Sequence, residues 1–207
     1  MTRVHPNFSN AVASSSSKSD EKLETPPIVL TVWKKSLLFN CKGYTVFDSK
    51  GALQFRVDSY SNRRNATEIV LMDHIGKPLL SFRRQRFCFG QKWLIYNGEE
   101  SKNPIFAVKK HMSSLLGCNK IVADVSRCGE TDEGDEYVVE GSYEGRCCCV
   151  YDRSKRTVAA EIQRKESTIN GVGFGNDVFR LVVDESELDS VVAMSIVILL
   201  EQMYPTS

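Results

Sequence analysis

Short runs of alternating apolar and polar residues fill most of the chain. Between positions 53 and 58 every second residue is apolar (Leu53, Phe55, Val57), and the residues between them are polar. Successive side chains of a strand point to opposite faces, so this alternation predicts a half-buried β-strand. Similar runs, which follow an apolar segment at 28–33, predict further strands at 44–47, 68–72, 79–83, 92–96, 105–109, 120–125, 136–141, 146–151, 157–163 and 177–183.

Three of the connections between these runs, 48–51, 73–76 and 152–155, open with aspartate. Aspartate accepts hydrogen bonds from nearby backbone N–H groups, and a glycine or polar residue takes the left-handed closing position, so each segment predicts a β-hairpin. Consecutive strands are then antiparallel neighbours. About a dozen short strands without long amphipathic helices between them favour a sandwich or barrel over a parallel α/β sheet.

The last part of the chain breaks the alternation. Residues 187–204 are good helix formers, with Ser186 as a capping residue and Asp189 in the first turn, where a carboxylate favours the helix dipole. From Val191 to Leu200 every residue except Ser195 is apolar, which leaves no face for water. This stretch is shorter than the roughly 20 residues that span a bilayer, so we predict a buried helix, with a membrane anchor as the alternative.

A helix without a polar face is stable in water when other elements cover it on every side. We therefore predict a mainly β fold: a closed antiparallel barrel of about twelve strands around a buried hydrophobic C-terminal helix. Residues 1–25, which are rich in serine and charge, predict a disordered tail, and residues 26–207 predict one barrel domain. The residues that we expect to face the helix include Leu53, Phe55, Leu80, Phe82 and Ile162.

Several segments between residues 28 and 204 resemble those of plant LURP-one-related proteins. Their order and spacing carry the resemblance more than any single segment does. The segments are Val46-Phe47-Asp48, Phe55-Arg56-Val57-Asp58, Val70-Leu71-Met72-Asp73, Gly76-Lys77-Pro78-Leu79-Leu80, the run from Trp93 to Gly98-Glu99, Val139-Glu140-Gly141-Ser142, and Asp177-Val178-Phe179-Arg180-Leu181-Val182-Val183 with the apolar helix that follows.

The resemblance implies a fold shared with the C-terminal domain of Tubby proteins and with phospholipid scramblases, a twelve-stranded barrel around a central hydrophobic helix. The LURP-one-related family has no established catalytic activity and is named for members linked to plant defence responses. Tubby proteins bind phosphoinositides at the membrane. No motif carries their lipid site onto individual residues of this chain, so the expectation of lipid binding rests on analogy of fold.

Composition places the chain among ordinary globular proteins, with 42% hydrophobic residues, 26% charged residues and a net charge of +1. The seven cysteines are an odd number and no apolar leader segment is seen, so we expect reduced thiols in the cytoplasm. Cys147, Cys148 and Cys149 are adjacent in a predicted strand. The outer two point one way and the middle one points the other, which favours core packing over metal chelation.

Candidate catalytic groups are few. His5 lies in the tail, His74 in a hairpin and His111 directly after two lysines, and none has a spacing that pairs it with a cysteine, serine or carboxylate. The sequence contains no nucleophile elbow, phosphate-binding loop or zinc-protease motif. We therefore expect a protein that is not an enzyme, without catalytic residues, cofactors or metal ligands.

Charge is divided along the chain. From Lys77 to Lys120 there are nine basic residues and two acids, whereas from Asp124 to Glu140 there are seven acids and one arginine. If the basic strands are neighbours, Arg83 and Lys109 lie on one outer face and can bind phosphates. The hypothesised lipid-phosphate site consists of Arg83, Arg84, Arg86, Lys109 and Lys110. Solvated outer strand faces are the alternative interpretation.

These features favour a non-enzymatic binding or regulatory module that binds phosphoinositides at the membrane surface, with a defence role implied by the resemblance. We expect a cytoplasmic monomer, peripheral at the plasma membrane, without a transmembrane segment. A protein-interaction scaffold with no lipid ligand is one alternative. A nucleic-acid-binding protein, suggested by the basic and aromatic residues at 83–87, is another, although a pI near 7.5 argues against nucleic acid as a partner.

Overall fold

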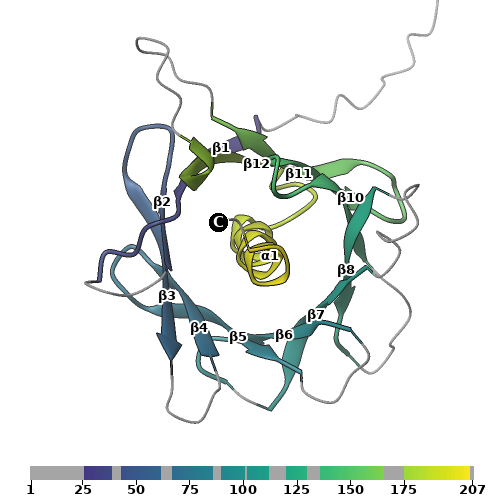
Figure 1. Ribbon diagram of the computed structural model, residues 1–207, viewed down its shortest axis with the longest axis horizontal. Coiled ribbons are helices and arrows are strands. Elements are labelled where there is room, and N and C mark those ends of the chain that lie inside the picture. The colour runs from purple at the N-terminus through teal and green to yellow at the C-terminus, as the bar shows by residue number, and fades with distance from the viewer. Residues whose placement is uncertain are drawn as a thin grey trace, which may run out of the picture.

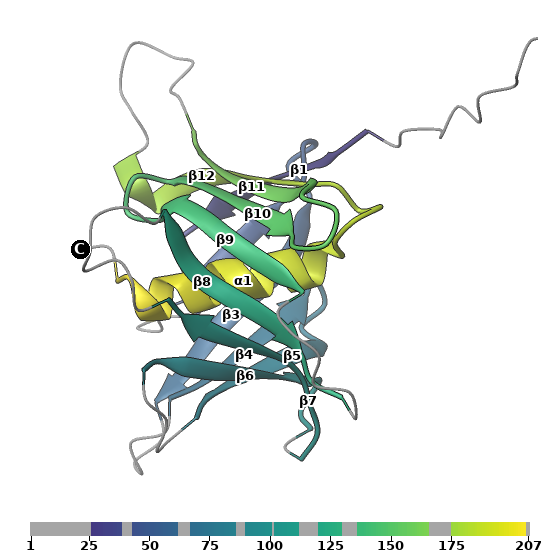
Figure 2. The same cartoon turned by 90° about the vertical axis from the view of Figure 1, so that its right-hand side faces the viewer.

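The computed structural model describes residues 26–38, 43–61, 67–85, 90–100, 102–111, 120–129, 136–165 and 175–205. In these ranges twelve antiparallel strands form a closed barrel, and one helix runs through its middle (Figure 1, Figure 2). The predicted fold, a closed barrel around a C-terminal helix, is confirmed. The tail predicted at 1–25 lies outside the described residues.

The strands pair in chain order around the barrel. They are β1 (Ile28–Trp33), β2 (Gly43–Phe47), β3 (Leu53–Ser61), β4 (Thr67–Asp73), β5 (Pro78–Arg84), β6 (Lys92–Asn97), β7 (Pro104–Lys110), β8 (Ile121–Arg127), β9 (Tyr137–Ser142), β10 (Cys147–Asp152), β11 (Val158–Arg164) and β12 (Val178–Val183). A 3-10 helix, η2 (Gly175–Asp177), leads into β12, and the central helix is α1 (Ser190–Met203). The first and last strands pair from Ile28 opposite Val183 to Trp33 opposite Val178, which closes the barrel.

The three predicted aspartate hairpins all form. In each one the aspartate carboxylate accepts hydrogen bonds from backbone N–H groups of the turn that follows it. Gly51 and Gly76 close the first two turns in the left-handed region, with φ of 81° and 91°. The third turn closes at Arg156, with φ of 59°, one residue beyond the predicted segment.

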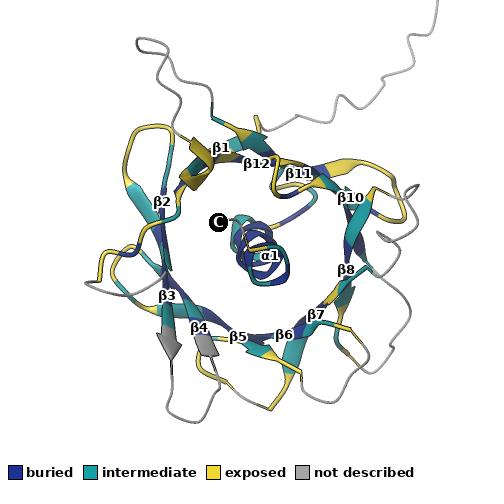
Figure 3. Ribbon diagram, viewed as in Figure 1, coloured by how far each residue is buried: buried dark blue, intermediate teal, exposed yellow. Residues whose placement is uncertain are grey.

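Inward-facing side chains from every strand pack around α1, which is buried on all sides from Ala193 to Leu200 (Figure 3). The hydroxyl of the buried Ser195 donates to the carbonyl of Val192 at 2.6 Å, so the one polar side chain of this stretch has a partner. The inward orientation is confirmed for Phe55, Leu80, Phe82 and Ile162. It is wrong for Leu53, which is half-buried beside a bulge between β2 and β3.

The helix begins three residues later than predicted. Ser186 does not cap it, because its hydroxyl donates to Oδ1 of Asp184 at 2.6 Å in the preceding turn. Asp189 is the N-cap residue instead, and its carboxylate accepts the N–H of Val191 at 2.7 Å. Among the described residues no helix combines the length and apolarity needed to cross a bilayer.

The antiparallel order gives the barrel two distinct ends. The connections after β1, β3, β5, β7, β9 and β11 lie at the end where α1 finishes, which we call the exit end. The other connections lie at the end where α1 begins, which we call the entry end. Hydrogen bonds fix both ends of the helix: the Tyr204 hydroxyl donates to the Val122 carbonyl at the exit end, and the Tyr137 hydroxyl donates to the Glu187 carbonyl at the entry end.

Replacing a buried residue of α1 tests the central position of the helix. We expect Leu199→Ala to lower the free energy of unfolding by about 2–5 kcal/mol, because apolar burial is lost and a cavity remains. Urea unfolding followed by circular dichroism measures this change. Gln202→Ala, at a half-exposed position of the same helix, is the control and should change stability by less than about 0.5 kcal/mol. Equal effects of the two substitutions would contradict the buried position of Leu199.

Candidate functional site

Charged side chains are divided unevenly between the two ends of the barrel. Among the described side chains of the exit end, cations outnumber acids: the cations are Lys34, Lys35, Arg83, Arg84, Lys92, Lys109, Lys110, Lys120, Arg146, Arg164 and Lys165, and the acids are Asp58, Asp124, Glu140, Glu144, Asp177 and Glu201. At the entry end acids outnumber cations: the acids are Asp48, Asp73, Glu99, Glu100, Glu136, Asp152, Asp184, Glu185, Glu187 and Asp189, and the cations are Lys50, Lys77, Lys102, Arg127, Arg153, Lys155 and Arg156. This division along the barrel axis is separate from the division along the sequence, because Lys77 and Lys102 of the basic segment lie at the entry end.

This axial division complements the dipole of α1. Lys110 Nζ donates to the carbonyl of Met203 at 2.8 Å and lies 4.0 Å from the centre of the Tyr204 ring, so a cation meets the negative end of the helix. At the entry end the carboxylate of Asp189 meets the positive end. Each such contact stabilises a helix by about 0.3–1 kcal/mol.

The five residues of the hypothesised lipid-phosphate site do not form one cluster. Arg83 on β5 and Lys109 on β7 lie on the outer face, where the strand alternation predicts them, but β6 separates the two strands. In the alternation of β5, Arg84 belongs to the inward-facing set, but it lies at the rim of the barrel and is exposed. Lys110 points inward to the end of α1 and does not belong to the outer surface. Arg86 lies outside the described residues.

The structure adds Lys92, which the sequence analysis did not select for this site. In the register of β6 and β7, Lys92 lies directly opposite Lys109. Like charges at directly opposed positions destabilise a sheet, and an anion between them removes that cost. Knowledge of the register of the β6–β7 hairpin would have been enough to predict this pair. We call Arg83, Arg84, Lys92 and Lys109 the basic face.

His111 has a carboxylate partner, which corrects the prediction made from spacing. Its Nδ1 lies 2.8 Å from Oδ2 of Asp124, and Oδ1 of Asp124 accepts a hydrogen bond from Arg153 at 2.7 Å. Asp124 lies on β8, the strand next to the one that His111 follows, and sequence spacing does not show cross-strand neighbours. Asp124 also lies opposite Lys109 in the register of β7 and β8. Both of its oxygens therefore have partners other than Lys109.

A buried carboxylate lies inside the exit end. Oε1 of Glu201 is 2.6 Å from Lys34 Nζ, and its Oε2 is 3.5 Å from Arg146 Nη2. The side chain of Glu201 is 8% exposed and that of Arg146 is 0% exposed, so both charges are removed from water. A buried charge is stable only with partners of opposite charge or with hydrogen bonds. This cluster therefore ties α1 to the end of β1 and to the β9–β10 connection.

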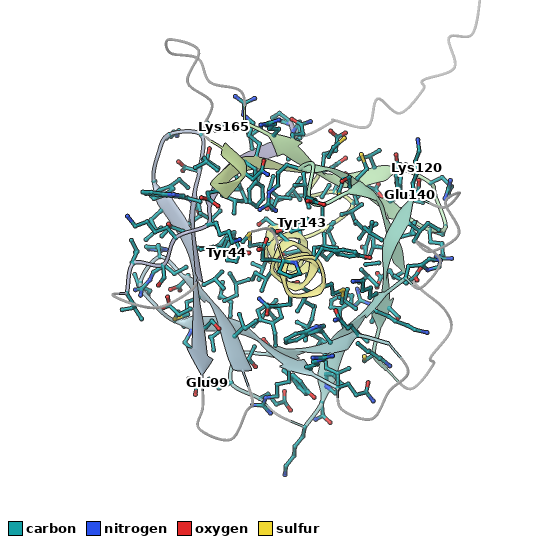
Figure 4. The ribbon with its side chains drawn as sticks, in the orientation of Figure 1. Tyr44, Glu99, Lys120, Glu140, Tyr143 and Lys165 are labelled. Carbon is teal, nitrogen blue, oxygen red and sulfur yellow. The ribbon has the colours of Figure 1, made fainter. Side chains whose placement is uncertain are left out.

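Arg146 adopts a backbone conformation that is unfavourable for a residue with a Cβ, with φ of 52°. Its guanidinium lies between two aromatic rings, 4.4 Å from the centre of Tyr143 and 4.2 Å from that of Phe179. Its Nε donates to the carbonyl of Asn176 at 3.0 Å. Tyr143 and Tyr44 lie inside the barrel beside α1 (Figure 4), where burial raises the pKa of both hydroxyls and keeps them neutral. These contacts hold the strained residue in place.

The adjacent cysteines alternate in orientation as predicted, but only one packs in the core. Cys148 is buried, Cys149 is half-buried and Cys147 is exposed. The core-packing prediction is confirmed for Cys148 and wrong for Cys147. Burial raises the pKa of the Cys148 thiol to about 12. Across the part of the chain that the structure describes, no three His, Cys, Asp or Glu side chains gather as metal ligands.

Comparisons with known proteins agree with the fold. A family model described as LURP-one-related matches residues 28–201. Protein LURP-one-related 8 of Arabidopsis thaliana is 46% identical over 210 residues, which cover 100% of both chains. Protein LURP-one-related 5 of the same plant is 41% identical over 189 residues, which cover 89% of this chain and 87% of the relative. An X-ray structure of an Arabidopsis thaliana protein has a TM-score of 0.62 at 20% identity, covers 86% of this chain and 91% of its own, and shows the fold alone.

Neutralising the buried carboxylate tests the ion cluster. We expect Glu201→Gln to lower the free energy of unfolding by about 3 kcal/mol, because Arg146 is left buried without its anionic partner. Urea unfolding measures the loss. Glu144→Gln, in the exposed turn next to Arg146, is the matched control and should stay within about 0.5 kcal/mol of the unmodified protein. A stability unchanged by Glu201→Gln would show that the cluster does not hold the helix.

Thiol alkylation tests the alternating orientation of the cysteines. In variants that retain a single cysteine, iodoacetamide at pH 8 should modify Cys147 in the folded protein and leave Cys148 unmodified, because only thiolate reacts and the pKa of Cys148 is about 12. Mass spectrometry of the intact protein measures the extent of reaction. Denaturation in urea should make the two residues react equally. Equal rates in the folded state would contradict the assignment of Cys148 to the core.

Proposed function

The chain belongs to the LURP-one-related family, and we propose that this member is a non-enzymatic binding module whose exit end binds phosphoinositides and other anionic phospholipids at a membrane surface. The observation that carries the proposal is the concentration of cations at that end, with Lys92 and Lys109 directly opposite each other on the basic face. A monomer in the cytoplasm, peripheral at the plasma membrane, and a role in plant defence belong to the same proposal.

The distribution of charge supports an oriented encounter with a membrane. A net charge of +1 gives the whole molecule little attraction for an anionic surface. The local excess of cations at the exit end attracts that surface, and the acids of the entry end are repelled by it, so the barrel axis turns toward the membrane normal. Each lysine or arginine near an anionic leaflet contributes about 1 kcal/mol.

The filled interior also supports binding on the outside. Helix α1 occupies the space inside the strands, where its apolar residues from Ala193 onward are buried. The exposed cations Arg84 and Lys109, with the half-buried Arg83 and Lys92, lie on the outer wall and the rim. Phosphate groups of a flat surface can reach such side chains without entering the barrel.

Charge reversal at the two ends tests the proposal. We expect Arg84→Glu combined with Lys92→Glu and Lys109→Glu to weaken binding to vesicles of phosphatidylcholine and phosphatidylinositol 4,5-bisphosphate by at least about 100-fold, because three favourable contacts of about 1 kcal/mol are lost. Vesicle flotation at low and high salt measures the binding. Salt should weaken binding of the unmodified protein and have little effect on the variant.

The matched control reverses three exposed lysines of the entry end. Lys50→Glu, Lys77→Glu and Lys102→Glu change the net charge by the same amount, and we expect vesicle binding to remain. Equal loss in both triple variants would reject the basic face as the site and leave only a net-charge effect. A protein that never floats with vesicles, yet captures another protein in high salt, would favour the interaction-scaffold alternative.

A further inference from the structure

Three large apolar side chains are exposed together where β1 leaves the barrel at the exit end. Trp33 is 40% exposed, Leu37 is 58% exposed and Leu38 is 40% exposed. They lie within six residues of one another, next to the exposed Lys35. Single exposed apolar residues are common on protein surfaces, but a cluster of large ones beside cations indicates a surface that contacts something apolar.

Hydrogen bonds hold this segment in place with its apolar side chains turned outward. The hydroxyl of Ser36 donates to Oδ1 of the buried Asp58 at 2.7 Å and accepts the N–H of Leu38 at 3.0 Å. On the other side, the Thr45 hydroxyl donates to the carbonyl of Lys35 at 2.9 Å. The polar groups of the segment thus point to β2 and β3, and Leu37 and Leu38 are left on the outside. These hydrogen bonds place the leucines on the outside of the described segment.

The two lysines of the segment have different roles. Lys34 follows β1 on its inward-facing side, two residues after Val32, and pairs with Glu201 inside the barrel. Lys35 points outward, and its Nζ lies 5.0 Å from the centre of the Trp33 ring. An ammonium next to an exposed indole suits the headgroup layer of a membrane, where tryptophan is enriched and lysine reaches phosphate.

We propose that Trp33, Leu37 and Leu38 form an insertion tip that enters the headgroup and acyl boundary of an anionic bilayer. This proposal rests on the proposed function. It adds an apolar contact with the bilayer, which makes the attachment of the protein stronger than electrostatic attraction alone does. The apolar faces of interfacial helices enter this boundary to a depth of about 5–10 Å, which is the layer that the tip would reach. The tip lies at the same end of the barrel as the basic face but on the opposite wall, so a membrane that meets the rim of the exit end contacts both.

The two tryptophans of the chain make insertion directly measurable. Trp93 is 5% exposed in the core, so Trp93→Phe leaves Trp33 as the only reporter at the surface. With vesicles of phosphatidylcholine and phosphatidylserine in equal parts, we expect the emission of Trp33 to shift to shorter wavelength and to be quenched by brominated acyl chains. Trp33→Phe, which retains only the buried Trp93, is the control and should show neither change.

Substitution of the leucines measures their contribution. We expect Leu37→Ser with Leu38→Ser to lower the vesicle partition coefficient about tenfold, which equals about 1.4 kcal/mol. Both side chains are exposed, and an unchanged urea midpoint will show that the fold is intact. Ile75→Ser is the matched control, because Ile75 is 75% exposed at the entry end, and its partition coefficient should not change.

The outcomes separate this proposal from the broader one. If the protein floats with anionic vesicles while Trp33 emission and bromine quenching stay unchanged, the insertion tip is wrong and electrostatic binding remains. If charge reversal of the basic face has no effect but Trp33 is quenched, the basic face is wrong and the tip remains. If neither variant set alters binding and Trp33 does not respond, the segment does not contact lipid and both the insertion tip and the basic face are wrong.

Discussion

Complete burial of α1 is the constraint on which the other features of the molecule depend. From Ala193 to Leu200 the helix offers water no polar surface, and the hydroxyl of Ser195 is satisfied within the helix itself. A sheet that closes on itself covers such a helix on every side, and closure also removes the unpaired strand edges of an open sheet. The pairing of β1 with β12 completes that cover. Most of the large apolar side chains of the strands therefore lie on the inner wall and pack against the helix.

With the interior filled, interactions with other molecules are left to the outer wall and the two ends. The ends differ because the connections alternate between them, and cations gather at one end and acids at the other. The helix dipole runs opposite to this arrangement and is complemented by it, and Lys110 and Asp189 are the residues that meet its two poles. The buried cluster of Glu201, Lys34 and Arg146 then fixes the helix relative to the exit end. The buried helix and the external charge pattern are thus both aligned with the barrel axis.

Local patterns were sufficient to predict the strands and the aspartate hairpins, because alternation and turn chemistry are properties of neighbouring residues. Closure of the barrel followed from the helix without a polar face. The predicted start of α1 was wrong because Ser186 and Asp189 are both residue types that cap helices. Asp189 is the cap because Asp184 already accepts the hydrogen bond of the Ser186 hydroxyl.

The candidate site was harder to predict than the fold, because it depends on cross-strand register. Register sets Lys92 opposite Lys109 and brings His111 to Asp124, and neither pairing follows from spacing. Glu201 meets Lys34 and Arg146 from distant parts of the chain. The inward direction of Lys110 follows from the same strand parity that identifies the core, so that signal was present in the sequence.

The closing pair of strands has a consequence for biosynthesis. β1 is followed by ten other strands before its partner β12 emerges from the ribosome, and the helix that fills the barrel comes after β12. Until then the nascent chain holds a curved sheet with two free edges and an uncovered apolar concave side, which is the kind of intermediate that aggregates. Folding can finish only after translation of α1, and the large sequence separation of the last contacts makes that step slow. The stage of folding most exposed to aggregation therefore falls at the end of synthesis, just before the helix fills the barrel.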